Sequence, residues 1–159
     1  MGEHIGFIGL GNIGKPIADN IARGGYALSV YDVAGTKERA PVGAMVASSV
    51  SHVAERANII FLCLPSLSSI SAVVAQISQA NCQDDAVVVN TSTAGPTAAQ
   101  AAYDRLNEHG IHYADAPISG SVARAGEGRL AVMFSGKAGL FERLEPVLKT
   151  FGNNLFNLG

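Results

Sequence analysis

Tryptophan is absent from this sequence of 159 residues, and only two cysteines occur in it. Cys63 lies within an apolar run and Cys82 within a polar segment, so we expect two reduced thiols and no structural disulfide. Neither cysteine has a neighbour that marks it as a nucleophile. The cysteines therefore argue against a disulfide-stapled scaffold and predict no thiol chemistry.

Long hydrophobic runs and an excess of positive charge are also missing. The longest apolar run, residues 59–64, stops at Pro65 and is far too short to cross a bilayer. The formal net charge is −2 and the basic residues are scattered, which is not the pattern of a nucleic-acid or membrane-surface protein. Because the chain enters a strand without a charged leader, we expect a cytoplasmic protein with neither kind of partner.

Histidine is scarce as well, with four residues. His109 and His112 are three positions apart, but Gly110 stands between them where a predicted helix gives way to a strand. The helical register that a pair of metal ligands needs is therefore broken. We predict surface or capping histidines and no metal site.

Apolar segments that alternate with amphipathic ones are what the sequence has in abundance. Its 48% hydrophobic and 15% charged residues suit one globular α/β domain over residues 1–159. Strands are predicted at residues 5–9, 27–32, 58–64, 86–90, 111–115, 130–135 and 155–158, and helices at 13–23, 50–56, 70–79, 98–109 and 140–151. Continuously apolar strands indicate burial on both faces, so we expect a doubly wound, mostly parallel sheet covered by helices.

A glycine motif at the first strand-to-helix junction is the strongest functional signal. It comprises Gly9, Leu10, Gly11, Asn12, Ile13 and Gly14. Gly9 would permit the tight turn, Gly11 the close approach of a pyrophosphate, and Gly14 the packing of the helix on the strand. An ordinary tight turn is the alternative. The flanking strand and helix favour the dinucleotide-binding fingerprint of a Rossmann-type fold.

The ends of the following strands are predicted to complete a nucleotide site, because ligands of such sheets bind at the carboxyl ends of strands. Asp32 ends the second strand, eighteen positions after Gly14, and can accept hydrogen bonds from a ribose diol while repelling a 2′-phosphate. NAD is therefore favoured over NADP. The alternative, NADP, stays open because Lys37 and Arg39 follow closely and could soften that repulsion. Further candidate cofactor residues at these ends are Val33, Leu64, Pro65 and Ser66.

The sequence resembles the β-hydroxyacid dehydrogenase family over essentially its whole length. That family includes 3-hydroxyisobutyrate dehydrogenase, tartronate semialdehyde reductase and 6-phosphogluconate dehydrogenase. The resemblance lies in residues 6–20, at Leu64-Pro65, in residues 90–96 from Asn90 to Pro96, and in residues 115–121 with Ala125 and Gly128-Arg129-Leu130 after them.

The resemblance implies roles for particular residues. Leu64, Pro65 and Thr93 would contact the cofactor, and the turn of Ser119, Gly120 and Ser121 would bind a substrate carboxylate. Backbone N–H groups in a glycine turn can indeed form an anion site. Ser121 stands where the family usually has a second glycine, so its side chain is expected to narrow the pocket or constrain the turn. Residues 120–128 are predicted to form a mobile loop.

The catalytic lysine of the family has no counterpart among these 159 residues, since the family places it after the last strand, at the start of an all-helical second domain. We therefore predict the cofactor domain of a longer enzyme that acts on a small 3-hydroxy acid, with no turnover by this chain alone. A stand-alone NAD-binding sensor or regulatory module is the alternative, and an imine reductase-like enzyme is a third possibility. Without the second domain, we expect an apolar face that makes the chain a homo-oligomer or leaves residues 120–128 poorly ordered.

Overall fold

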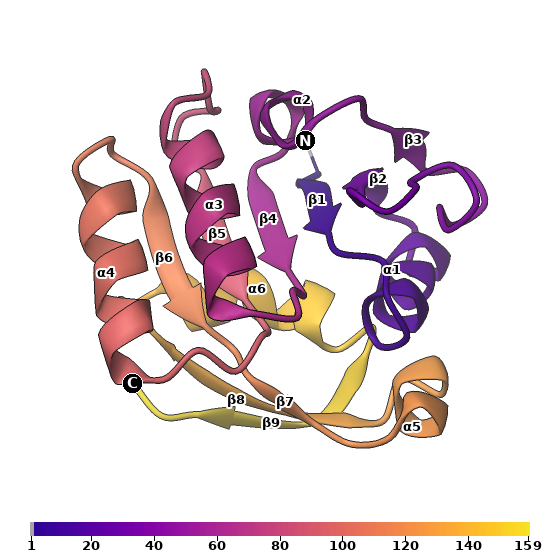
Figure 1. Cartoon of the computed structure of the whole chain (residues 1–159). Helices are drawn as coiled ribbons and strands as arrows, with labels where there is room; N and C mark the ends of the chain where they lie inside the picture. Colours follow the sequence, from indigo (N-terminus) through magenta and orange to yellow (C-terminus); the bar gives the residue numbers. More distant parts are fainter. Residues whose placement is uncertain (1) are drawn as a thin grey trace.

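The computed structural model describes residues 2–159 as one α/β unit (Figure 1). Its strands are β1 (His4–Ile8), β2 (Ala27–Tyr31), β3 (Met45–Val46), β4 (Ile59–Leu62), β5 (Val87–Asn90), β6 (His112–Asp115), β7 (Ile118–Ser119), β8 (Leu130–Gly136) and β9 (Gly152–Asn157). Its helices are α1 (Gly14–Arg23), α2 (Val50–Arg56), α3 (Leu67–Ser78), α4 (Pro96–Asn107), α5 (Val122–Gly126) and α6 (Leu140–Leu148).

Six strands form a parallel sheet in the order β3-β2-β1-β4-β5-β6. The central strand β1 pairs with β2 on one side and with β4 on the other, so that Ile5 lies beside both Leu28 and Ile59. The chain therefore reverses its direction of winding between β1 and β4. In open α/β sheets this switch point is where a crevice forms at the carboxyl ends of the strands. The predicted doubly wound fold is confirmed.

The last three strands extend the sheet with mixed polarity. Strand β8 runs antiparallel to β6 and β7, and β9 runs parallel to β8. In Figure 1 these three strands cross the lower part of the view, and α5 lies at one end of them. The extension carries the chain from the parallel sheet toward the N-terminal half of the molecule, where α5 contacts α1.

Helices cover both faces of the sheet and enclose two hydrophobic cores. One core joins α1 and α6 to the strands through side chains such as Ile17, Leu144 and Phe61. The other joins α2, α3 and α4 to the opposite face through side chains such as Val53 and Ile77. Strands β4 and β5 are buried along their whole length, which explains their continuous apolar sequences.

Two predicted helices begin earlier in the structure than periodicity indicated. The side chain of Ser66 accepts a hydrogen bond from the backbone of Ser69, and Ser69 returns one, so this capping box starts α3 at Leu67 and not at residue 70. Helix α4 starts with Pro96, directly after Gly95 at a positive φ of 81°. In both cases local capping chemistry sets the first turn before the apolar repeat begins.

The predicted mobile loop over residues 120–128 is wrong, because the structure has helix α5 there. Ser121 caps this helix by accepting a hydrogen bond from the backbone N–H of Arg124 (3.2 Å), and Ala125 is completely buried. The short strands β3 and β7 were not predicted either. A strand of two residues and a helix of five are too short to show a period of their own.

Candidate functional site

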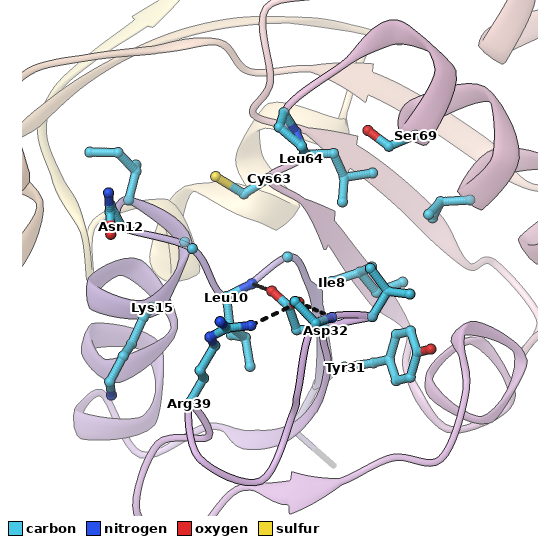
Figure 2. A pocket seen from close by; sticks show the side chains of 18 of the residues that line it. Ile8, Leu10, Asn12, Lys15, Tyr31, Asp32, Arg39, Cys63, Leu64 and Ser69 are labelled. Carbon is cyan, nitrogen blue, oxygen red and sulfur yellow. Dashed lines mark hydrogen bonds and ion pairs between the residues drawn. The ribbon is translucent and has the colours of Figure 1, made fainter.

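A cavity of about 860 Å³ opens at the carboxyl ends of β1, β2 and β4, beside the N-terminus of α1 (Figure 2). It lies at the switch point of the sheet. Ten of the predicted cofactor residues line it: Gly9, Leu10, Gly11, Asn12, Ile13, Gly14, Asp32, Val33, Leu64 and Pro65. The fold thus brings three separate segments of the sequence to one cavity.

At two of its three glycines, the loop between β1 and α1 leaves no room for a side chain. Gly9 has a positive φ of 104°, and a Cβ there would collide with the carbonyl oxygen of Cys63. A Cβ on Gly14 would collide with the carbonyl oxygen of Gly9, within the same turn. Gly11 differs, since among the described residues nothing but its own two chain neighbours lies within 4 Å of the place its Cβ would take. The space next to Gly11 is open for a ligand.

The N-terminal residues of α1, Gly14, Lys15 and Pro16, line this space. Ile13 is the N-cap, and neither a side-chain cap nor an acidic residue occupies the first turn. The positive end of the helix dipole favours an anion at this place, as the phosphates of a dinucleotide would be. The residues present therefore fit a dinucleotide: a backbone cradle at Gly11 and a helix terminus without a competing carboxylate.

Asp32 lies at the other side of the glycine loop, next to the end of β2, with its side chain 12% exposed. One carboxylate oxygen, Oδ2, accepts a hydrogen bond from the backbone N–H of Leu10 (2.6 Å). The other, Oδ1, accepts one from the backbone N–H of Ala34 (2.8 Å) and lies 3.3 Å from Nη1 of Arg39. Asp32 therefore ties the glycine loop to the segment after β2, and Figure 2 shows dashed lines from its carboxylate to Leu10 and to Arg39.

The turn after β4 is held by a buried polar chain that the sequence analysis missed. Ser92 accepts a hydrogen bond from the backbone N–H of Leu64 (2.8 Å) and donates its own backbone N–H to the side chain of Asn90 (3.0 Å). Asn90 is fully buried and donates to the hydroxyl of Tyr113 (3.4 Å), which donates to Asp115 (2.7 Å). A polar residue closing a wholly apolar strand, as Asn90 does in β5, was the available signal.

Burial raises the pKa values of three groups in and near this site, Cys63, Tyr113 and Asp115. Desolvation and the hydrogen bond to Asp115 raise the pKa of the Tyr113 phenol. Desolvation likewise raises the pKa of the Asp115 carboxyl, although the Tyr113 hydroxyl counteracts it. The pKa of the Cys63 thiol, which lines the cavity, is raised by burial. A thiol so shifted stays protonated near neutral pH.

Besides Arg39, four other side chains with polar or ionisable groups line the cavity: Lys15, Tyr31, Cys63 and Ser69. Lys15, in the first turn of α1, forms an ion pair with Asp19 across one helical turn (3.2 Å). Two predicted cofactor residues, Ser66 and Thr93, do not line the cavity. Ser66 caps α3, and Thr93 is exposed between β5 and α4, so their contact with a cofactor stays a prediction.

The predicted substrate turn lies outside the cavity, at the start of α5. Gly120 has a positive φ of 147°, and Ser121 constrains the turn as the N-cap of the helix. On the other side of α5, the buried amide of Asn20 in α1 donates a hydrogen bond to the carbonyl oxygen of Ala125 (2.7 Å). Asn20 thus links α5, which follows the predicted substrate turn, to α1, which follows the glycine loop. Binding of a carboxylate at the turn of residues 119–121 stays a prediction.

Replacing Asn20 by alanine is expected to lower the free energy of unfolding by about 1–3 kcal/mol, because the Ala125 carbonyl and the Arg23 guanidinium both lose their partner. Chemical denaturation measures this change. The matched control is Asn107→Ala at the exposed end of α4, which should change stability by less than about 0.5 kcal/mol. Equal effects of the two substitutions would show that the link between α1 and α5 contributes nothing.

Within residues 2–159, no helix has the length and apolar character needed to cross a membrane. No group of three or more histidine, cysteine, aspartate or glutamate side chains in the same residues is arranged to hold a metal ion.

Comparison with known proteins gives consistent matches. Residues 4–159 match the family described as the NAD binding domain of 6-phosphogluconate dehydrogenase. The chain is 36% identical to mitochondrial 3-hydroxyisobutyrate dehydrogenase of Mus musculus, over 98% of this chain and 48% of that protein. It is 32% identical to 2-(hydroxymethyl)glutarate dehydrogenase of Eubacterium barkeri, over 98% of this chain and 53% of that protein.

A solved structure of 3-hydroxyisobutyrate dehydrogenase from Mycobacterium tuberculosis matches with a TM-score of 0.91 and 25% identity, covering all of this chain and 55% of that one. The chain thus spans about half the length of the relatives it matches. With the fingerprint cavity, the doubly wound sheet and these matches together, the chain belongs to the β-hydroxyacid dehydrogenase family, as an NAD-binding domain of the 6-phosphogluconate dehydrogenase type.

Proposed function

We propose that this chain is the cofactor-binding half of an enzyme that transfers a hydride between NAD and a small 3-hydroxy acid. The observation that carries the proposal is the convergence of the glycine loop, the open N-terminus of α1 and Asp32 on one cavity. When bound, NAD supplies the hydride acceptor. The residues of this chain bind and orient the cofactor, with the diphosphate beside Gly11 and the adenosine ribose beside Asp32.

We further propose that these 159 residues do not supply the general acid or base of the reaction. Of the charged groups on the cavity, Asp32 and Arg39 are paired with each other and Lys15 is paired with Asp19. The thiol of Cys63 is held protonated by burial. The proton-transferring group would then come from a second domain, together with the rest of the pocket for the hydroxy acid.

The direct test is the stability of the chain with and without NAD. A ligand that binds only the folded state should raise the free energy of unfolding by about 2.7 kcal/mol at a hundredfold excess over its dissociation constant. Thermal or chemical unfolding measures the shift. No shift at millimolar NAD would contradict the proposal.

Activity assays separate the proposed enzyme from its alternative. The 159 residues alone should show no turnover of 3-hydroxyisobutyrate, tartronate semialdehyde or 6-phosphogluconate. Turnover well above background would refute the proposal that the general acid or base lies outside these residues. If the full natural protein binds NAD and oxidises no 3-hydroxy acid, the stand-alone sensor or regulatory module is the better function.

Asp32 is expected to make NAD bind about tenfold more tightly than NADP, which corresponds to about 1.4 kcal/mol. Its carboxylate accepts the ribose hydroxyls and repels a 2′-phosphate. Asp32→Ala should therefore weaken NAD binding more than NADP binding in isothermal titration. Asp104→Ala, at an exposed position in α4, removes the same charge away from the cavity and should leave both affinities unchanged. An Asp32 variant that keeps the preference for NAD over NADP would show that another residue distinguishes the two cofactors at the ribose.

A further inference from the structure

The turn after β4 forms one wall of the cofactor cavity, where Leu64 and Pro65 line it. Pro65 has no backbone N–H group, so Leu64 supplies the only backbone donor of the two residues. Within residues 2–159 this N–H makes the one hydrogen bond of the pair, to the hydroxyl oxygen of Ser92 (2.8 Å). A single side chain, 28 positions away in the sequence, therefore holds this wall.

The same turn lies in close contact with the glycine loop. A Cβ on Gly9 would collide with the carbonyl oxygen of Cys63 and would lie 3.2 Å from Cδ2 of Leu64. Because closely packed segments transmit small displacements, a shift of the turn would also disturb the glycine loop. The position of Leu64 thus affects two walls of the cavity at once.

Ser92 is itself fixed, because the hydrogen bonds behind it can run in only one direction. Its backbone N–H donates to the side chain of Asn90 (3.0 Å), and an N–H can only donate, so the acceptor is the carbonyl oxygen of the Asn90 amide. The amide nitrogen then donates to the hydroxyl of Tyr113 (3.4 Å), whose proton goes to Asp115 (2.7 Å). Asn90 is fully buried, and Ser92 and Tyr113 are 9% and 6% exposed. Breaking one of these bonds would leave a buried polar group without a partner, which costs more than the bond gains.

The strand pairing places this chain of hydrogen bonds across the carboxyl end of the sheet. Leu62 in β4 lies beside Asn90 in β5, and Asn90 lies beside Asp115 in β6. Thr91 donates both its backbone N–H (2.9 Å) and its hydroxyl (2.7 Å) to the carbonyl oxygen of Leu62. The segment that carries Ser92 is thereby fixed to the end of β4, so its hydroxyl offers a stationary acceptor to the turn.

We propose that Ser92 is a positioning residue of the cofactor site: its hydroxyl, held in place through Asn90, keeps Leu64 and Pro65 where they contact a bound dinucleotide. The inference rests on the proposed cofactor-binding function. Ser92 is not among the residues that line the cavity, so it acts through the turn and does not touch the cofactor. Without this hydroxyl the Leu64 N–H loses its partner, and the turn moves to satisfy it with water. Binding must then order the turn again, which lowers the affinity.

The first test is a titration of Ser92→Ala with NAD, in which the affinity should fall about tenfold. The matched control is Ser78→Ala in α3. Ser78 is 3% exposed and its hydroxyl also makes one hydrogen bond, to the carbonyl oxygen of Ala75 (2.7 Å), but it does not line the cavity. Both variants should unfold at a lower denaturant concentration than the wild type, whereas the control should keep its NAD affinity within about twofold.

The second test is hydrogen exchange of single backbone amides, followed by NMR without NAD. In Ser92→Ala the Leu64 amide should exchange about tenfold faster or more. The amide of Cys63, which donates to the carbonyl oxygen of Ile8 (3.0 Å), should change no more than it does in Ser78→Ala. Ser92→Thr keeps a hydroxyl acceptor and should retain both the slow exchange of Leu64 and the NAD affinity. Ser92→Cys, with a weaker acceptor, should fall between the wild type and Ser92→Ala.

The outcomes distinguish this inference from the proposed function. If the wild-type chain binds no NAD, the proposed function fails and this inference fails with it. If the wild type binds NAD and Ser92→Ala weakens binding no more than Ser78→Ala does, the positioning role is overturned and the proposed function stands. The same holds if Ser92→Ala weakens binding while the Leu64 amide stays protected, or if Ser92→Thr keeps that amide protected and still loses the affinity. Should Ser92→Ala not fold, Ser92→Cys carries the same comparisons.

Discussion

Replacing Gly11 by alanine is expected to lower the affinity for NAD about a hundredfold, or about 2.7 kcal/mol, without destabilising the fold. Apart from Gly11 and its two chain neighbours, no atom of residues 2–159 lies within 4 Å of the position that the new Cβ would take, and the φ of Gly11 is not in the left-handed region. The methyl group would instead occupy the space proposed for the diphosphate. Isothermal titration with NAD measures the affinity, and chemical denaturation without NAD measures the stability.

The control for this variant is Gly126→Ala in α5. Gly126 likewise has no protein atom near its would-be Cβ and no positive φ, but it is away from the cavity. Neither its stability nor its NAD affinity should fall by more than about 0.5 kcal/mol. If the Gly11 variant binds NAD as tightly as the wild type, the diphosphate does not lie against the glycine loop, and the proposed orientation of the cofactor is wrong.

Replacing Gly14 by alanine should have the opposite profile, with a loss of about 3 kcal/mol in the free energy of unfolding. The Cβ would collide with the carbonyl oxygen of Gly9 and approach Phe7 Cε1 to 3.3 Å. The obstacle is backbone, which cannot rotate away, so α1 would have to move off β1. Alanine has the higher helix propensity by up to about 1 kcal/mol, but this gain is smaller than the cost of the collision.

Chemical denaturation in the absence of NAD checks the Gly14 prediction. Gly126→Ala again serves as the reference, since it adds the same methyl group to a helical glycine without a collision. A Gly14 variant as stable as that reference would show that the packing of α1 on β1 tolerates a side chain. Gly14 would then not be needed for folding, whereas the structure indicates that Gly14 is needed for the packing of α1 and Gly11 for the binding of the ligand.

Local patterns predicted the parallel part of the fold well. The alternation of apolar strands and amphipathic helices predicted every strand from β1 to β6 except the two-residue β3, because each of the predicted strands spans at least two structural periods. The glycine motif predicted the position of the cavity, since its spacing is tied to a strand-to-helix turn. Beyond β6 the prediction was poorer, because β7 and α5 are short and depend on contacts with distant residues.

The sequence by itself determined the doubly wound sheet, the cofactor cavity at its switch point and the placement of Asp32 in that cavity. Each depends on residues close together in the chain, whose preferences act before the chain is compact. Tertiary structure alone decided the contacts between distant segments: Asn20 with Ala125 over 105 positions, and Leu64 with Ser92 over 28. It also decided that Arg39 folds back onto Asp32. No periodicity encodes such pairs, because they form only when separate elements pack and bury polar groups that must then find partners.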